Sequence, residues 1–153
     1  MMKPKHALLA FTAALLLASP APERLLADPL LTYPLRIKAH TVRAEIANTE
    51  ESRRRGLMFR RNLPENHGMI FIYPAKSRQG MWMKNTPIPL SVAFIDERGH
   101  IVNMADMEPF SEQPHYSAGE VKYALEVNQG WFARHGIRTG DRVEGLDRLP
   151  PAK

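Results

Sequence analysis

The feature that most constrains the fold of this chain is a series of short apolar segments separated by turn-forming residues. Val42, Ala44 and Ile46 alternate with charged residues, which predicts a half-buried strand. Similar segments recur along the chain at a spacing of roughly 8–12 residues. They cover residues 68–73, 79–84, 90–95, 101–107, 121–127 and 142–146. Short strands at this spacing favour an antiparallel β-sandwich or a barrel-like domain.

Two short helices are expected among these strands. Asn48, followed three residues later by Glu51, has the form of a capping box and predicts a helix over residues 49–55 that Gly56 ends. Residues 129–135 are long enough for one or two helical turns. Neither segment is long enough to cover a sheet, so a mainly β domain is favoured over a layered α+β fold.

Turn residues fix several strand ends in this prediction. Asp96-Glu97-Arg98-Gly99 separates two apolar segments and indicates a hairpin, with glycine available for a left-handed conformation. Pro74 follows the segment 68–73 and is expected to end that strand.

The N-terminus has the pattern of an export signal. Lys3 and Lys5 precede an uncharged apolar run from Ala7 to Ala18, which is short for a transmembrane span. Cleavage is expected near residue 21 or residue 27, and an uncleaved anchor is the alternative. The sequence therefore predicts export to the periplasm or the extracellular space.

The rest of the chain divides into three parts. Residues 28–34 are expected to form a linker, 35–147 a single domain and 148–153 a tail. Removing residues 1–27 takes away Lys3, Lys5, Arg24 and Glu23, so the net charge falls from +5 to +3. The chain has no cysteine, which excludes disulfides, thiol catalysis and thiolate metal sites.

The run from Met81 to Pro87 has a composition that no ordinary strand or turn requires. If residues 79–84 form a strand, Trp82 and Lys84 share one face and the two methionines the other. Trp82 could then be a platform for a sugar ring or another flat ligand, and Lys84, Asn85 and Thr86 would supply polar contacts. The alternative places Trp82 in the core beside a capped turn.

Several ordered motifs resemble the bacterial and archaeal family called domain of unknown function 192. They are Gly56-Leu57-Met58, Gly68-Met69-Ile70-Phe71, Trp82-Met83-Lys84-Asn85-Thr86, Phe94-Ile95-Asp96, Ile101-Val102, Leu125-Glu126-Val127-Asn128 with Gly130, and Gly136-Ile137 with Gly140-Asp141. The resemblance runs from about residue 35 to 145 and implies a compact, mainly β domain of sandwich type that is often exported. It implies no established activity. One departure is Ser91, which follows Leu90 where the family usually has aspartate.

Asp96, Glu126 and Asn128 complete the set of candidate ligand-binding residues. Glu126 lies between Leu125 and Val127 in a predicted strand, so its side chain faces opposite to theirs, toward solvent or a cleft. A glycan hydrolase would need two carboxylates roughly 5–10 Å apart, and Asp96 with Glu126 is the pair to consider. We expect no metal site, because the histidines have no ligand spacing, and no cofactor.

Three functions remain open from the sequence. The first is an exported module that binds a small polar ligand or glycan near residues 82–86. The second is a non-catalytic envelope protein that binds a protein partner, and the third is a glycan-directed hydrolase. Export argues against a nucleic-acid partner, and contact with a membrane is expected only through the signal peptide.

Overall fold

The computed structural model describes residues 31–153 of the chain. Nine strands, two short helices and one 3-10 turn follow one another in these residues. They are β1 (Thr32–Ile37), β2 (His40–Ala47), α1 (Glu50–Arg55), β3 (His67–Ser77), β4 (Gly80–Met81), β5 (Leu90–Ile95), β6 (Ile101–Met107), β7 (His115–Tyr116), β8 (Val121–Asn128), α2 (Trp131–Arg134), β9 (Val143–Glu144) and η1 (Leu146–Arg148).

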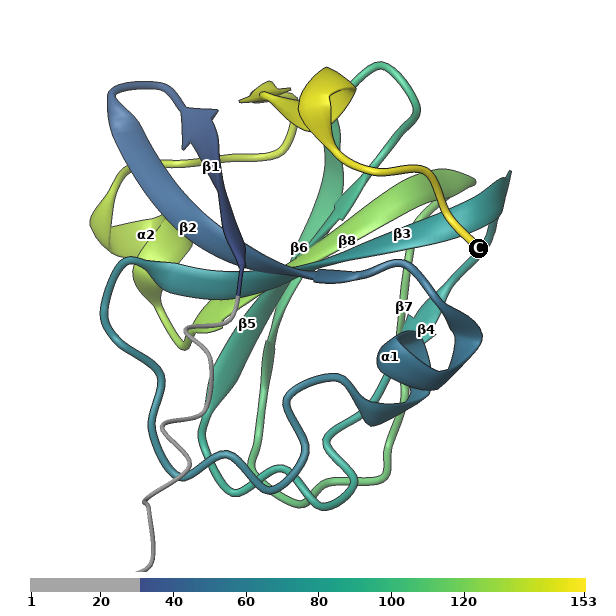
Figure 1. The fold of residues 1–153 in the computed structure, drawn as a ribbon. Helices are drawn as coiled ribbons and strands as arrows, with labels where there is room; N and C mark the ends of the chain where they lie inside the picture. The colour runs from purple at the N-terminus through teal and green to yellow at the C-terminus, as the bar shows by residue number, and fades with distance from the viewer. Residues whose placement is uncertain (1–30) are drawn as a thin grey trace, which may run out of the picture.

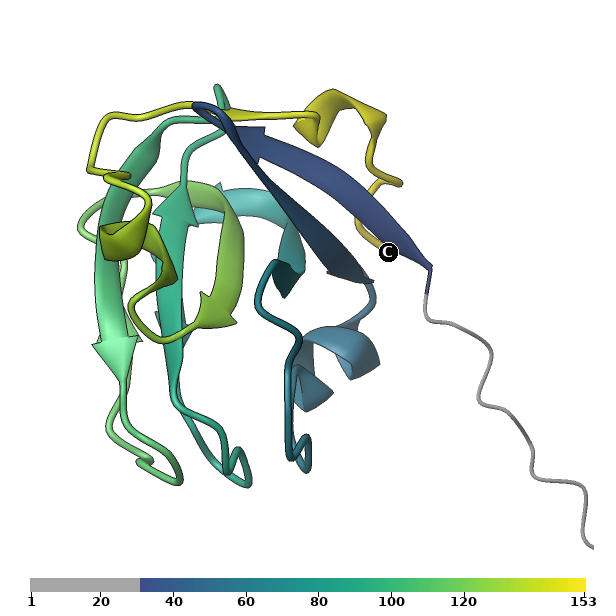
Figure 2. The same cartoon turned by 90° about the vertical axis from the view of Figure 1, so that its left-hand side faces the viewer.

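Seven of the strands form one sheet in the order β6-β5-β8-β3-β2-β1-β9, and β4 pairs with β7 in a second, two-stranded sheet. The large sheet curls into an open half-barrel, with α2 at one end and α1 at another (Figures 1 and 2). The prediction of a mainly β, barrel-like domain with two short helices is confirmed. All strand pairs are antiparallel except β2 and β3, which run parallel because α1 lies in the connection between them.

Both faces of the sheet are buried. On β3, Ile70 and Ile72 belong to one hydrophobic cluster, whereas Met69, Phe71 and Tyr73 belong to another. We call these the Trp131 face and the Glu126 face, after a residue that each contains. A sheet buried on both faces has nearly continuous apolar strands, as β3 and β5 do.

Close approach of two strands explains the glycine in the motif at residues 68–71. A Cβ atom added to Gly68 would lie 2.3 Å from the main-chain oxygen of Glu126. Only glycine therefore allows β3 to pack against β8 at this position.

The first helix begins one residue later than expected, and its cap differs. Thr49, not Asn48, is the N-cap: its hydroxyl accepts the main-chain N–H of Ser52, and Ser52 Oγ accepts that of Thr49. Serine thus takes the place in the capping box that we assigned to Glu51. Asn48 instead donates to the main-chain oxygen of Pro151.

Three predicted strand ends are wrong. β3 continues through Pro74 to Ser77, because its register with β8 shifts after Ile72 and no ladder hydrogen bond is required of the proline. The expected strand 79–84 is reduced to β4, because β7 offers only two pairing residues. The expected strand 142–146 is reduced to β9, which Gly145 ends with a φ of 95°.

The ends of the described chain are more ordered than expected. β1 begins at Thr32, inside the segment 28–34 that we expected to be a linker, and it pairs with β2. In the expected tail, the N–H of Lys153 donates to the main-chain oxygen of Asn48. The predicted export signal lies outside the described residues. Within residues 31–153, no helix is both long and apolar enough to cross a bilayer.

Candidate functional site

A pocket of about 350 Å³ opens on the Glu126 face, between α1, β3 and the loop around β4. It brings together three of the seven sequence-predicted site residues, Trp82, Thr86 and Glu126. The remaining lining residues are Glu50, Arg53, Arg54, Arg55, Gly56, Leu57, Met58, Phe71, Tyr73, Gln79, Gly80 and Met81. The pocket therefore combines an apolar wall with a few polar groups, which is the usual composition of a small-molecule site.

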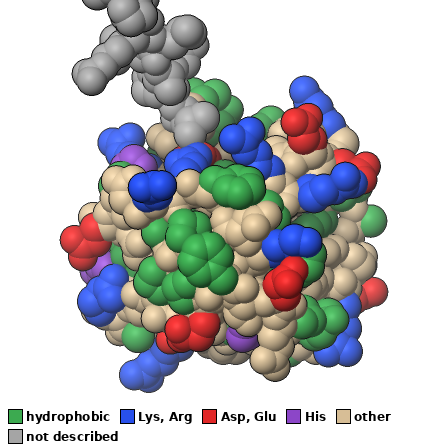
Figure 3. Space-filling model, turned by 90° about the horizontal axis from the view of Figure 1, so that it is seen from below, with side chains coloured by type: hydrophobic (Ala, Val, Ile, Leu, Met, Phe, Trp, Pro, Cys, Tyr) green, Lys and Arg blue, Asp and Glu red, His purple; other side chains and the backbone are tan. Residues whose placement is uncertain are grey.

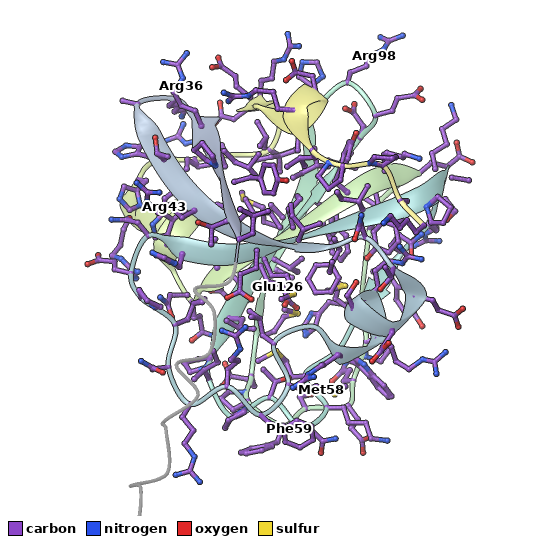
Figure 4. All side chains as sticks on the ribbon, in the orientation of Figure 1. Arg36, Arg43, Met58, Phe59, Arg98 and Glu126 are labelled. Atoms are coloured by element: carbon purple, nitrogen blue, oxygen red, sulfur yellow. The ribbon has the colours of Figure 1, made fainter. Side chains whose placement is uncertain are left out.

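Glu126 comes from the middle of the sheet. It lies on β8 between its pairing partners Met69 on β3 and Val92 on β5, both of which are buried and apolar. Its side chain points from the sheet toward the half of the molecule that carries Met58 and Phe59 (Figure 4). The predicted orientation opposite to Leu125 and Val127 is correct. The side chain is not in open solvent, however, because the residue is only 4% exposed.

The carboxyl group of Glu126 has no partner of opposite charge in the part of the chain that the structure describes. Within residues 31–153 no side chain forms an ion pair with it, and burial raises its pKa from 4.5 to about 8. At neutral pH it is therefore mostly a neutral acid, which can donate one hydrogen bond and accept others.

Tyr73 is the second polar group on the inner wall of the pocket. Its hydroxyl donates to the Met81 sulfur at 3.4 Å. Burial raises the pKa of Tyr73, nearby Glu126 raises it further and Arg53 lowers it, so the phenol stays protonated. Arg53 is itself oriented by hydrogen bonds to the main-chain oxygens of Ile72 and Lys153.

Trp82 is exposed at the pocket, which excludes the alternative that places it in the core. Met81 and Met83 are buried, whereas Trp82 remains 44% exposed. The alternation expected of a strand therefore holds in burial, although only Gly80–Met81 pairs as a strand. Lys84 Nζ lies 5.2 Å from the centroid of the Trp82 ring, as in a cation–π contact.

The other residues of this run have structural tasks. Lys84 also pairs with Glu112 at 3.6 Å on the surface. Asn85 has a φ of 53°, and its main-chain oxygen accepts the N–H of Phe59. Thr86 lines the pocket, but its hydroxyl donates to the main-chain oxygen of Lys84.

Four of the seven predicted site residues do not line the pocket: Lys84 and Asn85, described above, and Asp96 and Asn128. Asp96 accepts the main-chain N–H groups of Arg98 and His100, and so fixes the hairpin turn. Asn128 donates to the main-chain oxygens of Leu63 and Pro64. Both side chains are thus explained by the loops that they hold in place.

The carboxylate pair considered for a hydrolase is not assembled. Val92 on β5 pairs with Glu126, and Asp96 lies four residues further along, one residue past the end of β5. At about 3.3 Å per residue the two main-chain positions are roughly 13 Å apart along the strand, and Asp96 does not line the pocket that Glu126 lines.

Exposed aromatic side chains form a second surface feature, on the loops below the pocket. Phe59 and Phe110 are 69% and 62% exposed. Their main-chain N–H groups donate to the oxygens of Asn85 and Thr86 respectively, which ties three loops together. Hydrophobic side chains gather at the centre of this end of the molecule (Figure 3). We call Phe59 and Phe110 the aromatic tip.

Sequence reasoning missed Tyr73 and the arginines of α1 as parts of the site. Tyr73 ends a continuous apolar run from Met69, and such a run indicates burial on both faces. Among residues 31–153, no group of three or more histidines and carboxylates could hold a metal ion.

Fold and site together define a mainly β domain with a half-barrel sheet and a mixed polar and apolar pocket on its Glu126 face. The chain belongs to the family called domain of unknown function 192, DUF192, described as an uncharacterized ACR, whose model matches residues 33–145. No curated protein matches the chain.

Two crystal structures are similar to this chain. One is a proposed transcription regulator from Sinorhizobium meliloti 1021, with 36% sequence identity and a TM-score of 0.71; the match covers 73% of this chain and 92% of that one. The other is a protein of unknown function from Novosphingobium aromaticivorans, with 35% identity and a TM-score of 0.74; that match covers 84% of this chain and 94% of the other.

Proposed function

We propose that this protein is an exported binding module that holds a small polar ligand or a single sugar ring in the pocket beside Trp82. The observation that carries the proposal is Glu126, a buried acid that lines the pocket and has no charged partner within residues 31–153. Burying such a group costs free energy, and no ion pair within residues 31–153 offsets that cost. A ligand that forms a hydrogen bond with the carboxyl group of Glu126 would offset the cost.

Trp82 supports a ligand with a flat or ring-shaped apolar side. Its indole is large, partly exposed and placed at the same pocket as Glu126 and Tyr73. An aromatic platform opposite hydrogen-bonding groups suits a sugar ring, which has apolar C–H faces and a rim of hydroxyls. Export is supported by the basic and apolar pattern of residues 1–18.

Binding and stability measured on Trp82→Ala test the proposal. Binding is measured by protein NMR for a panel of neutral monosaccharides and sugar acids. We expect Trp82→Ala to weaken binding at least about tenfold while lowering stability by no more than about 1 kcal/mol, because the side chain is partly exposed. Phe110→Ala, an exposed aromatic outside the pocket, is the matched control and should bind normally.

Two results would contradict the proposal. One is that no member of the panel perturbs the pocket residues. The other is a loss of about 3–5 kcal/mol of stability in Trp82→Ala, which is the cost of deleting a core aromatic.

The aromatic tip favours a second candidate function, binding of an envelope protein. Loops that expose two phenylalanines are unusual on a surface with no partner. The nearby charges Lys84 and Arg60 are already paired with Glu112 and Glu45, which suits a protein surface better than an anionic polymer. Co-purification of an envelope protein that is lost in a Phe59→Ser, Phe110→Ser variant but kept in Trp82→Ala would support this function. Equal capture by all variants would exclude the tip as the binding surface.

A further inference from the structure

We propose that the ligand of the Glu126 pocket is an acidic sugar, a ring whose carboxylate is bound by arginine at the mouth of the pocket. This inference rests on the proposed function and names the class of ligand. It starts from the charges that surround the pocket. The last turn of α1 places Arg53, Arg54 and Arg55 along its lining, and the acidic lining residues are Glu50 and Glu126.

The two acidic residues do not neutralise these arginines. Glu50 forms an ion pair with Arg54 at 2.5 Å, and that pair is exposed on the helix surface. Glu126 is mostly protonated at neutral pH, because burial raises its pKa to about 8. Arg53 and Arg55 therefore leave the pocket with net positive charge.

Arg55 is the arginine best placed to bind a ligand. It is exposed at the pocket, and its guanidinium has no hydrogen-bond or ion-pair partner within residues 31–153. Arg53 differs, since main-chain oxygens already hold two of its donors. A guanidinium can bind a carboxylate through two parallel hydrogen bonds, which adds both affinity and orientation.

The interior of the pocket matches the rest of such a ligand. Its volume of about 350 Å³ is at the small end of the range for ligand sites and suits one ring. Glu126 and Tyr73 supply hydroxyl-type donors and acceptors on the inner wall, and Trp82 supplies an apolar platform. In this arrangement the carboxylate of the ligand lies at the arginines and its hydroxyls face inward.

Glucuronic acid and glucose form the matched pair of probes, since they differ only in the oxidation of C6. Calorimetric titration of the purified protein at low salt and slightly acidic pH should show glucuronate binding at least about tenfold more tightly than glucose. Arg55→Gln should remove most of that preference and leave the unfolding temperature unchanged. Arg43→Gln, with the same change of charge at a position outside the pocket, should keep the preference; Figure 4 labels Arg43.

The outcomes separate this inference from the proposed function. Equal affinity for the two sugars, lost in Trp82→Ala, would overturn the acidic ligand and leave the binding module intact. A preference for glucuronate that Arg43→Gln reduces as much as Arg55→Gln would show attraction by net charge alone, and would also overturn it. Binding of no sugar in the panel would overturn both proposals.

Discussion

Glu45 and Glu126 lie in one row across the Glu126 face of the sheet, separated by Met69, and both are nearly inaccessible to solvent. Glu45 receives two hydrogen bonds from Arg60, at 3.0 and 2.5 Å, whereas Glu126 has no charged partner in the described residues. The carboxylate of Glu45 therefore has its charged partner within the fold. The carboxyl group of Glu126 faces the pocket instead, where the ligand that we propose would supply its partner.

The largest effect that would test this contrast is the dependence of stability on pH. Glu126 ionises near 4.5 in the unfolded chain and near 8 in the folded one. Between these values the folded state keeps a proton that the unfolded chain releases, so stability falls as the pH rises. The loss is roughly 1 kcal/mol per pH unit, and it stops above about pH 8.

Comparison of Glu126→Gln with the wild type isolates this loss, because glutamine does not titrate. We expect the variant to gain about 3 kcal/mol on the wild type between about pH 5 and about pH 8, measured by denaturant unfolding. Glu120→Gln, at an exposed position, is the control. A difference that does not vary with pH would mean that Glu126 is ionised in the folded protein, and the contrast with Glu45 would disappear.

A smaller effect is expected when the partner of Glu45 is removed. Arg60→Ala leaves a buried carboxylate unpaired, which should lower the free energy of unfolding by about 2 kcal/mol, less than for a fully buried pair because Arg60 is partly exposed. In a double-mutant cycle, adding Glu45→Gln should restore about half of the free energy of unfolding that Arg60→Ala loses. Lys76→Ala, which breaks the exposed pair with Glu97, should cost less than about 0.5 kcal/mol. Equal costs for the two pairs would show that Glu45 is not specially supported.

The contrast between the glutamates also shows how far the sequence could go. Most of the longer strands, the hairpin at Asp96 and the opposite faces of Trp82 and its flanking methionines follow from alternation and turn chemistry, and the structure confirms them. Which of those two faces is buried did not follow from the sequence. The burial of Glu126 does not follow from its own strand, because a lone glutamate between Leu125 and Val127 is typical of an exposed face. The continuous apolar run of β3 contained the missing signal, since it required a second buried face.

Other features depend on contacts that no local pattern contains. The parallel pairing of β2 with β3 and the long reach of β3 past Pro74 are set by neighbouring strands. Arg60 reaches Glu45 across fifteen residues of sequence, and Asn128 reaches the loop at Leu63 across sixty-five. A residue's own neighbours therefore predicted its element but not its partner, and in this protein the partner decides which glutamate is available to a ligand.

The smallest expected effect concerns the loops that border the open side of the pocket. Phe59 has a φ of 64° and is exposed, so its side chain contributes little packing while its backbone is in a conformation that favours glycine. Phe59→Gly should leave stability unchanged or raise it by up to about 1 kcal/mol, measured by thermal unfolding. Asn85→Gly, with a φ of 53°, should gain less, because asparagine tolerates this conformation better than phenylalanine does. A loss of more than about 1 kcal/mol of stability in Phe59→Gly would mean that the phenylalanine packs against the loops it joins. The aromatic tip would then stabilise the loops beside the pocket, and binding of a protein partner would not be needed to explain it.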